Sequence, residues 1–230
     1  MATLVLLPGL EGTGELFDPF LKVFGDRTRT QVVRYPTDVV LGYDEHQDFV
    51  RKALPVDEPY VLFGESFSGP IAIALAAEAP PSLKGLVLCC TFARNPRPGL
   101  AGARVLLPFI PLLDMPPFAL SHLLLGKFRS PALLSAISRA VEQVRPAVLR
   151  ARLQAVLCVD SSALLARVRV PSIYLQASED RLIPKSALAH IQAVCPSVAA
   201  AKIEAPHCLL QSSPDAAASA ISSFMRELAL

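Results

Sequence analysis

The chain has 230 residues, of which 52% are apolar and 18% are charged, and its net charge is +2 at pH 7. This length and composition are typical of one globular domain with a full core, and they exclude an intrinsically disordered chain. The small net charge argues against nucleic-acid binding, and the lack of eighteen consecutive apolar residues free of proline and charge argues against a membrane span.

The N-terminal run and the cysteines both indicate a cytoplasmic protein. MATLVLLPGL, residues 1–10, has no basic region before its apolar part, so it predicts a buried strand rather than a signal peptide. The five cysteines show no C-x-x-C spacing, and the four histidines are scattered. This pattern is typical of buried thiols in a reducing compartment, and we expect neither a disulfide framework nor a metal or other cofactor.

Six apolar runs alternate with helical patterns along the chain. The runs are residues 3–8, 31–36, 60–64, 83–91, 172–178 and 200–205. The helical patterns are residues 15–24, 44–54, 70–79, 185–194 and 215–228. Near-continuous apolar strands between helices indicate a parallel sheet covered on both faces. The sequence therefore predicts an α/β fold with a mainly parallel sheet of about six strands.

The alternation breaks between the fourth and fifth runs, at residues 94–169, which we call the insert. Six prolines punctuate its first half, and two or three helices are predicted in its second half. The insert carries an unusual number of apolar side chains at Leu106, Leu107, Phe109, Ile110, Leu112, Leu113 and Phe118. These side chains predict either a helical subdomain that packs on the sheet domain or a lid over an apolar pocket. Residues 1–93 and 170–230 would form the core.

The insert is also basic, with eleven Lys or Arg residues against three Asp or Glu residues. One explanation is a solvated helical face. The other is a surface for an acidic partner, such as a carrier protein.

The segment GESFSG, residues 64–69, follows the third apolar run and precedes an alanine-rich helix. A serine on a sharp strand-to-helix turn must adopt a strained backbone conformation, and this requires small neighbours. Gly64, Ser68 and Gly69 meet that steric demand around Ser66. Ser66 is therefore the candidate nucleophile.

A serine nucleophile needs a base and an acid. In proteins whose nucleophile stands on a strand-to-helix turn of this kind, the acid follows a later strand and the histidine follows the last strand. His46 and His122 precede any acid that could follow the fifth run, and His190 lies within a predicted helix. His207 follows the sixth run directly, so it is the candidate base.

The sequence SED at the end of the fifth run offers Glu179 and Asp180 as the acid. We favour Asp180 because it opens the turn DRLIP, in which Pro184 can start the next helix. The alternative role for Asp180 is a helix N-cap. The catalytic assignment has His207 accept the serine proton while Asp180 fixes its tautomer.

A tetrahedral intermediate also needs backbone N–H donors. The N–H of Phe67 at the start of the helix is one candidate, and the N–H of Leu10 in the loop LPGLEGTG is the other. That glycine-rich loop could instead hold a phosphate. It matches no dinucleotide or P-loop motif, however, and Glu11 would repel a phosphate.

Together GESFSG, LPGLEGTG, SEDRLIP and APHCLL resemble the motifs of the α/β-hydrolase superfamily over nearly the whole chain. The resemblance implies the α/β-hydrolase fold without its usual first two strands, and a cap at the position of the insert. It also implies that the turn GESFSG, which is called the nucleophile elbow in this superfamily, lies near the switch point of the sheet. Two positions depart from the common pattern: Pro8 replaces a histidine, and Ser68 replaces a glycine.

The resemblance and the apolar insert favour hydrolysis of carboxylic esters with an apolar acyl group, as in small cytoplasmic serine esterases with a helical lid. A thioesterase or a hydrolase of acyl-carrier-protein esters is the first alternative, which the basic insert supports. The loop LPGLEGTG also looks like that of acyl-transferring relatives, so an acyltransferase is a second alternative. A non-catalytic ligand binder is the third.

Overall fold

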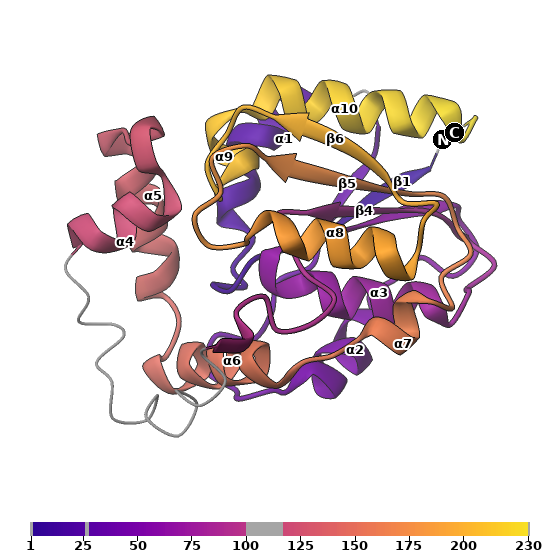
Figure 1. Cartoon of the computed structure of the whole chain (residues 1–230), viewed down its shortest axis with the longest axis horizontal. Coiled ribbons are helices and arrows are strands. Elements are labelled where there is room, and N and C mark those ends of the chain that lie inside the picture. Colours follow the sequence, from indigo (N-terminus) through magenta and orange to yellow (C-terminus); the bar gives the residue numbers. More distant parts are fainter. Residues whose placement is uncertain (1, 26–27, 100–116, 230) are drawn as a thin grey trace.

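The computed structural model, which describes residues 2–25, 28–99 and 117–229, contains a parallel sheet of six strands (Figure 1). The strand order is β2-β1-β3-β4-β5-β6, and every neighbouring pair is parallel. The strands are β1 (Thr3–Leu7), β2 (Thr30–Val32), β3 (Tyr60–Glu65), β4 (Leu83–Cys89), β5 (Ser172–Ala177) and β6 (Ala199–Ile203). The predicted sheet is confirmed.

Helices cover both faces of this sheet (Figure 1). One face packs against α1 (Asp18–Phe24), α9 (Leu209–Ser212) and α10 (Pro214–Glu227). The other packs against α2 (Tyr43–Arg51), α3 (Gly69–Ala77), α7 (Ser162–Leu165) and α8 (Lys185–Val194). Successive side chains of a strand point to opposite faces, so Leu4 and Leu6 join one apolar cluster while Val5 and Leu7 join the other. This explains why the strands read as continuous apolar runs.

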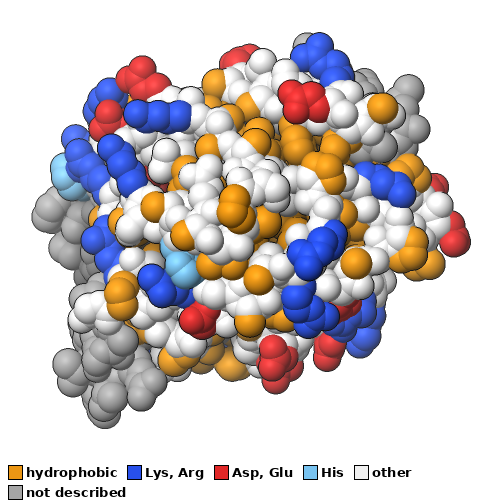
Figure 2. Space-filling model, turned by 45° about the vertical axis from the view of Figure 1, so that its right-hand side comes forward, with side chains coloured by type: hydrophobic (Ala, Val, Ile, Leu, Met, Phe, Trp, Pro, Cys, Tyr) orange, Lys and Arg blue, Asp and Glu red, His pale blue; other side chains and the backbone are white. Residues whose placement is uncertain are grey.

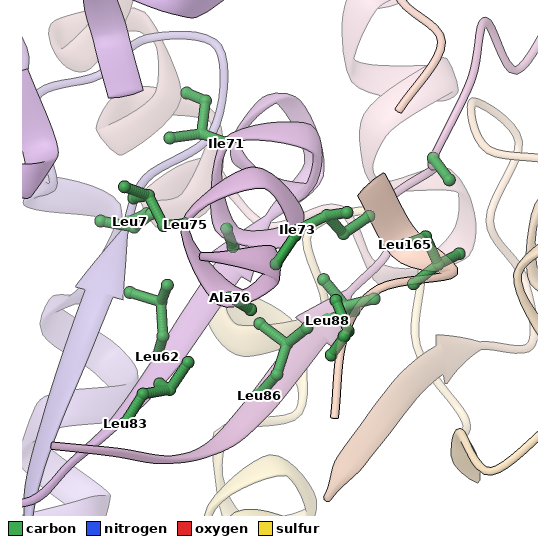
Figure 3. Close-up of a cluster of buried hydrophobic side chains, with 14 of the residues drawn as sticks. Leu7, Leu62, Ile71, Ile73, Leu75, Ala76, Leu83, Leu86, Leu88 and Leu165 are labelled. Carbon is green, nitrogen blue, oxygen red and sulfur yellow. The ribbon is translucent and has the colours of Figure 1, made fainter. Parts of the chain in front are cut away.

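Helix α3 lies against the centre of the sheet and follows β3 after a short 3-10 turn, η3 (Ser66–Ser68). Every residue of α3 is buried. Figure 3 shows Ile73 and Ala76 of this helix among Leu62, Leu86 and Leu88 of the strands. A helix that is apolar all round and rich in alanine can approach a sheet closely on one side and pack against other helices on the other.

The order in which strands are added to the sheet changes side between β1 and β3. Strand β2 lies on one side of β1, whereas β3 and all later strands lie on the other side. Leu7 of β1 pairs with Gly64 of β3, so the loops after these two strands start side by side at the carboxyl edge. Ligands of open α/β sheets bind at such a switch point.

The second strand is shorter than the predicted run of residues 31–36, and this part of the prediction is wrong. Its partner β1 ends at Leu7 because Pro8 and Gly9 begin the next loop. Beyond Val33 the ladder has no partner, and the N–H of Tyr35 instead bonds the carbonyl of Gly12 at 2.8 Å.

The described part of the insert is helical: its first helices lie beyond the carboxyl ends of the strands, whereas α7 packs beside α3 and α8 (Figure 1). Its elements are α4 (Pro117–Leu124), the 3-10 turn η6 (Gly126–Phe128), α5 (Pro131–Glu142), α6 (Pro146–Cys158) and α7. Helix α5 contacts the 3-10 turn η1 (Glu15–Phe17), where Gln143 donates to Glu15 at 2.8 Å. The apolar residues 106–113 and the side chain of Phe118 lie outside the described residues.

On the face shown in Figure 2, Lys and Arg side chains form separate groups among acidic and apolar side chains. Within the described ranges, no helix is both long and apolar enough to cross a bilayer. Nor do three or more His, Cys, Asp or Glu side chains gather there as metal ligands.

Candidate active site

Ser66 stands at the tip of the turn between β3 and α3, with φ of 49°. This left-handed conformation is rare for a residue with a side chain, and it agrees with the strained turn expected from the sequence. A Cβ added to Gly64 would lie 2.8 Å from the Cβ of Ala72, so the strand and helix approach too closely for any larger residue. The turn leaves Ser66 partly exposed.

The structure brings Ser66, His207 and Asp180 together from three separate segments. Ser66 Oγ lies 3.0 Å from His207 Nε2. His207 Nδ1 lies 2.9 Å from Asp180 Oδ2. The acid follows β5 and the histidine follows β6, so both come from the same carboxyl edge of the sheet as Ser66.

His207 and Asp180 shift each other's pKa. Burial alone would lower the pKa of His207, but the carboxylate of Asp180 outweighs it and raises the pKa above its usual value. Burial raises the pKa of Asp180, but the charge and hydrogen bond of His207, together with the N–H groups of Ile183 and Leu182, outweigh it, and the net pKa is lowered. An imidazole that gains a proton is therefore stabilised at this position.

Asp180 is also held by its own turn. Its Oδ1 accepts the N–H groups of Leu182 at 2.8 Å and Ile183 at 2.9 Å, while Oδ2 faces His207. The residue does not cap α8, whose N-cap is Pro184. The other candidate acid, Glu179, is exposed, and its Oε1 lies 3.7 Å from Nζ of Lys127 in the insert.

The remaining histidines lie elsewhere. His190 of α8 lies 2.8 Å from the hydroxyl of Ser162, and His122 of α4 contacts Arg181. His46 of α2 is fully buried, and its Nδ1 lies 2.7 Å from the carbonyl of Gly42. Burial lowers the pKa of His46 to about 4, so this ring is neutral near pH 7.

The candidate oxyanion donors lie in adjacent loops. Leu10 lies in the tight turn after β1 that a hydrogen bond of 3.2 Å closes from the N–H of Gly12 to the carbonyl of Gly9. Phe67 is the second residue of η3, directly after Ser66. Ser68 ties the two loops together, because its hydroxyl donates to the carbonyl of Pro8.

Several polar side chains at this site were missed by the sequence analysis. Glu65, immediately before Ser66, is buried, and its Oε1 accepts from Gln211 at 3.2 Å. The hydroxyls of Tyr35 and Ser68 lie 2.6 Å apart. Arg152 of the insert is 1% exposed and reaches the loop of Leu10. Arg152 occupies a position that reads as a solvated helix residue, so only the folded structure could identify it.

Apolar side chains of the insert gather next to His207 and the loop that holds Leu10. Leu125 and Ile137 pack with Cys208, the neighbour of His207, and with Leu16. A second group on the insert, Val144, Val148 and Leu149, packs against Leu10. The candidate triad is therefore bordered by apolar side chains of the insert.

The comparisons with known proteins agree with the fold described above. A model of the family described as alpha/beta hydrolase family matches residues 4–220. No curated protein sequence matches the chain. Among solved structures, a hydrolase from Oleispira antarctica is similar with a TM-score of 0.84 and 16% identity, covering 98% of this chain and 91% of that one.

Two further structures have the same fold. A hydrolase from Pseudomonas aeruginosa has a TM-score of 0.82 and 19% identity, with 97% of this chain and 89% of that chain covered. A thermophilic esterase from Thermogutta terrifontis has a TM-score of 0.79 and 20% identity, with 99% and 90% covered.

Proposed function

The chain belongs to the alpha/beta hydrolase family, and from this premise we propose that it is a serine hydrolase that cleaves carboxylic esters with an apolar acyl group. The observation that carries the proposal is the pair of hydrogen bonds from Ser66 to His207, at 3.0 Å, and from His207 to Asp180, at 2.9 Å. Similarity to esterases such as the one from Thermogutta terrifontis supports the choice of ester substrates.

In the proposed mechanism, Ser66 Oγ attacks the acyl carbon while His207 Nε2 takes the hydroxyl proton. Asp180 keeps the imidazole in the reactive tautomer and stabilises the imidazolium. The protonated histidine then gives this proton to the leaving alkoxide, so an alcohol departs and an acyl-enzyme remains on Ser66. Water repeats the sequence: its proton goes to His207, its oxygen bonds the acyl carbon, and the acid leaves as Ser66 regains its proton.

The N–H groups of Leu10 and Phe67 are the proposed donors to the tetrahedral oxyanion. One such donor is worth about 100- to 1,000-fold in kcat in enzymes of this mechanism. Both residues belong to loops that start at the carboxyl ends of β1 and β3, which are paired strands.

The proposed acyl site and lid rest on the apolar surroundings of the triad. Residues 1–93 and 170–230 would form the core, and the insert would form the lid. Leu125 and Ile137 beside Cys208, and Leu149 beside Leu10, support an apolar acyl group on the insert side of Ser66. Burying an apolar acyl chain contributes about 0.8 kcal/mol per CH₂.

Part of the basic charge of the insert is used within the molecule and is not available to a carrier protein. Two arginines of the basic insert are engaged within the molecule, since Arg152 donates to the carbonyls of Leu10 and Glu11, and Arg97 donates to those of Arg181 and Leu182. A free ester is therefore the substrate class we propose.

The test is hydrolysis of p-nitrophenyl esters from acetyl to palmitoyl, with Ser66→Ala and the exposed control Ser138→Ala. We expect a rate that peaks at one chain length, is lost in Ser66→Ala and is unchanged in Ser138→Ala. A fluorophosphonate should label Ser66, as located by peptide mass spectrometry. Equal hydrolysis by Ser66→Ala would refute the proposal. A folded wild-type protein that neither hydrolyses nor is labelled would be a ligand binder, and faster transfer to an added alcohol than to water would identify an acyltransferase.

A further inference from the structure

Arg152 extends from α6 of the insert into the core beneath the loop that follows β1. Its side chain is among the largest that are fully buried in the described part of the chain. Nη1 donates to the carbonyls of Leu10 at 2.8 Å and Glu11 at 2.9 Å, and Nη2 donates to the carbonyl of Pro36 at 2.9 Å. Burying a guanidinium is costly, so this placement requires bonds that replace its water.

A nearby charge and an aromatic ring partly offset the cost of burying the guanidinium. Burial lowers the pKa of Arg152, and the charges of Tyr35 and of the buried Glu11 oppose that shift. The centre of the guanidinium lies 5.6 Å from the ring centroid of Tyr35, within the range of a cation–π contact.

These bonds complete a set that fixes the loop. Four consecutive carbonyls, from Gly9 to Gly12, accept hydrogen bonds: that of Gly9 from the N–H of Gly12, those of Leu10 and Glu11 from Arg152, and that of Gly12 from Tyr35. In a trans peptide the N–H points away from the C=O. Arg152 bonds the carbonyl of Glu11, which shares a peptide with the N–H of Gly12, and that N–H in turn bonds the carbonyl of Gly9. The Gly9 carbonyl shares a peptide with the N–H of Leu10, so these bonds also fix the direction of the proposed oxyanion donor.

The loop and the guanidinium are in direct contact at Gly12. A Cβ added there would lie 2.5 Å from Arg152 Nη1, and the φ of 73° at Gly12 also disfavours any side chain. Gly12 is thus required by both the turn and the approach of Arg152.

The same network reaches the elbow. The hydroxyl of Tyr35 lies 2.6 Å from that of Ser68, and Ser68 donates to the carbonyl of Pro8. Ser68 is the second residue after Ser66, and Phe67, the other proposed donor, lies between them. Arg152 and Tyr35 therefore connect the insert to both loops that carry the proposed oxyanion donors.

We propose that Arg152 is a positioning residue through which the insert holds the oxyanion loop in its reactive conformation. The proposal rests on the proposed function for its catalytic consequence. Arg152 does not touch the reacting atoms. Its removal should therefore lower kcat and leave KM nearly unchanged, because the loop stabilises the transition state rather than the bound ester. A purely structural arginine would lower stability and leave the kcat of the folded enzyme intact.

The experiment compares Arg152→Ala and Arg152→Lys with wild type, and with Arg139→Ala as the matched control on the exposed face of α5. Steady-state rates are measured on the p-nitrophenyl ester that wild type hydrolyses fastest. Hydrogen exchange of the amides of residues 9–14 is measured by mass spectrometry as a readout that needs no activity.

We expect kcat to fall about 100-fold in Arg152→Ala, as for a misplacement of about 1 Å, with KM within about threefold of wild type. Millimolar guanidinium should restore part of the rate to Arg152→Ala but not to Ser66→Ala. Arg152→Lys should recover only part of kcat, because an ammonium lacks the planar fork that bonds two carbonyls at once. Exchange in residues 9–14 should speed up, and Arg139→Ala should match wild type.

Unchanged kcat in folded Arg152→Ala, or unchanged exchange in residues 9–14, would overturn the proposal. If Arg152→Ala does not fold, Arg152→Lys decides: reduced kcat with a wild-type melting temperature supports positioning, and wild-type kcat overturns it. If wild type shows no hydrolysis at all, the proposed function fails, and the exchange measurement alone decides whether Arg152 fixes the loop.

Discussion

Replacing Glu65 with glutamine should abolish a loss of folding stability that this buried carboxyl causes as the pH rises. Glu65 is 6% exposed and its Oε1 accepts from Gln211 at 3.2 Å. Glu11 lies close by on the other side of Gly9: a Cβ added to Gly9 would be 3.1 Å from Glu11 Oε2 and 3.7 Å from Glu65 Oε2. Burial, and then the charge of Glu11, raise the pKa of Glu65 to about 7.

The sign follows from proton binding in the two states. Between the usual pKa of 4.5 and the folded pKa of about 7, the folded protein holds a proton on Glu65 that the unfolded chain has lost. Stability therefore falls as the pH rises through this interval, by about 1.4 kcal/mol per pH unit, and levels off above it. The full loss is about 3 kcal/mol. Glutamine keeps the size and hydrogen-bonding capacity of the protonated acid but does not titrate.

The assay is urea unfolding of wild type and Glu65→Gln at several pH values from 4.5 to 8, followed by circular dichroism because the chain has no tryptophan. The free energy of unfolding of Glu65→Gln, relative to wild type, should increase by about 3 kcal/mol across this range. The exposed control Glu227→Gln should show no such trend. A difference between wild type and Glu65→Gln that is constant with pH would refute the reasoning.

Two further substitutions test the geometry around the triad. Asp180→Asn should lower kcat about 10,000-fold by losing the tautomer control of His207, measured by steady-state kinetics. Because the pKa of Asp180 is lowered, its stabilising contribution is present above pH 3.8 and lost as the pH falls through the folded pKa, so the variant should show less acid-induced loss. Gly69→Ala places a Cβ 1.9 Å from Thr91 Oγ1 and should destabilise the fold by about 1–3 kcal/mol in urea unfolding. Thr91→Ala in the same chain should recover part of that loss, and strict additivity of the two would contradict the predicted clash.

The sequence was most informative for features that depend on neighbouring residues, such as the bounds of a helix or the position of a residue after a strand. Helix α8 has the predicted bounds, Lys185–Val194, because Pro184 sets its start and its apolar spacing is helical. Ser66, Asp180 and His207 could be selected because each lies in the loop after a strand of a parallel sheet, and such strand ends must meet at one edge. Their catalytic roles remain predictions.

The buried polar residues around the triad could not be predicted in the same way. Tyr35 falls in a run that reads as a strand, and its hydroxyl partner on Ser68 is 33 residues away. Arg152 lies 142 residues from the carbonyl of Leu10 that it bonds. Contacts of this kind depend on how segments distant in the sequence pack together, and no local pattern encodes them. The glycines of the loop LPGLEGTG show only that the backbone can turn tightly there; that Arg152 approaches Gly12 is visible only in the structure.

The basic character of the insert has an internal use that neither a solvated face nor an acidic partner accounts for. Arg97 donates to the carbonyls of Arg181 and Leu182, in the turn that holds Asp180. Arg152 donates to the carbonyls of the oxyanion loop. Guanidinium groups suit this task because they keep their charge when buried and present several donors in a fixed plane. The insert thus contacts the turn that holds Asp180 and the loop that holds Leu10 through two separate arginines.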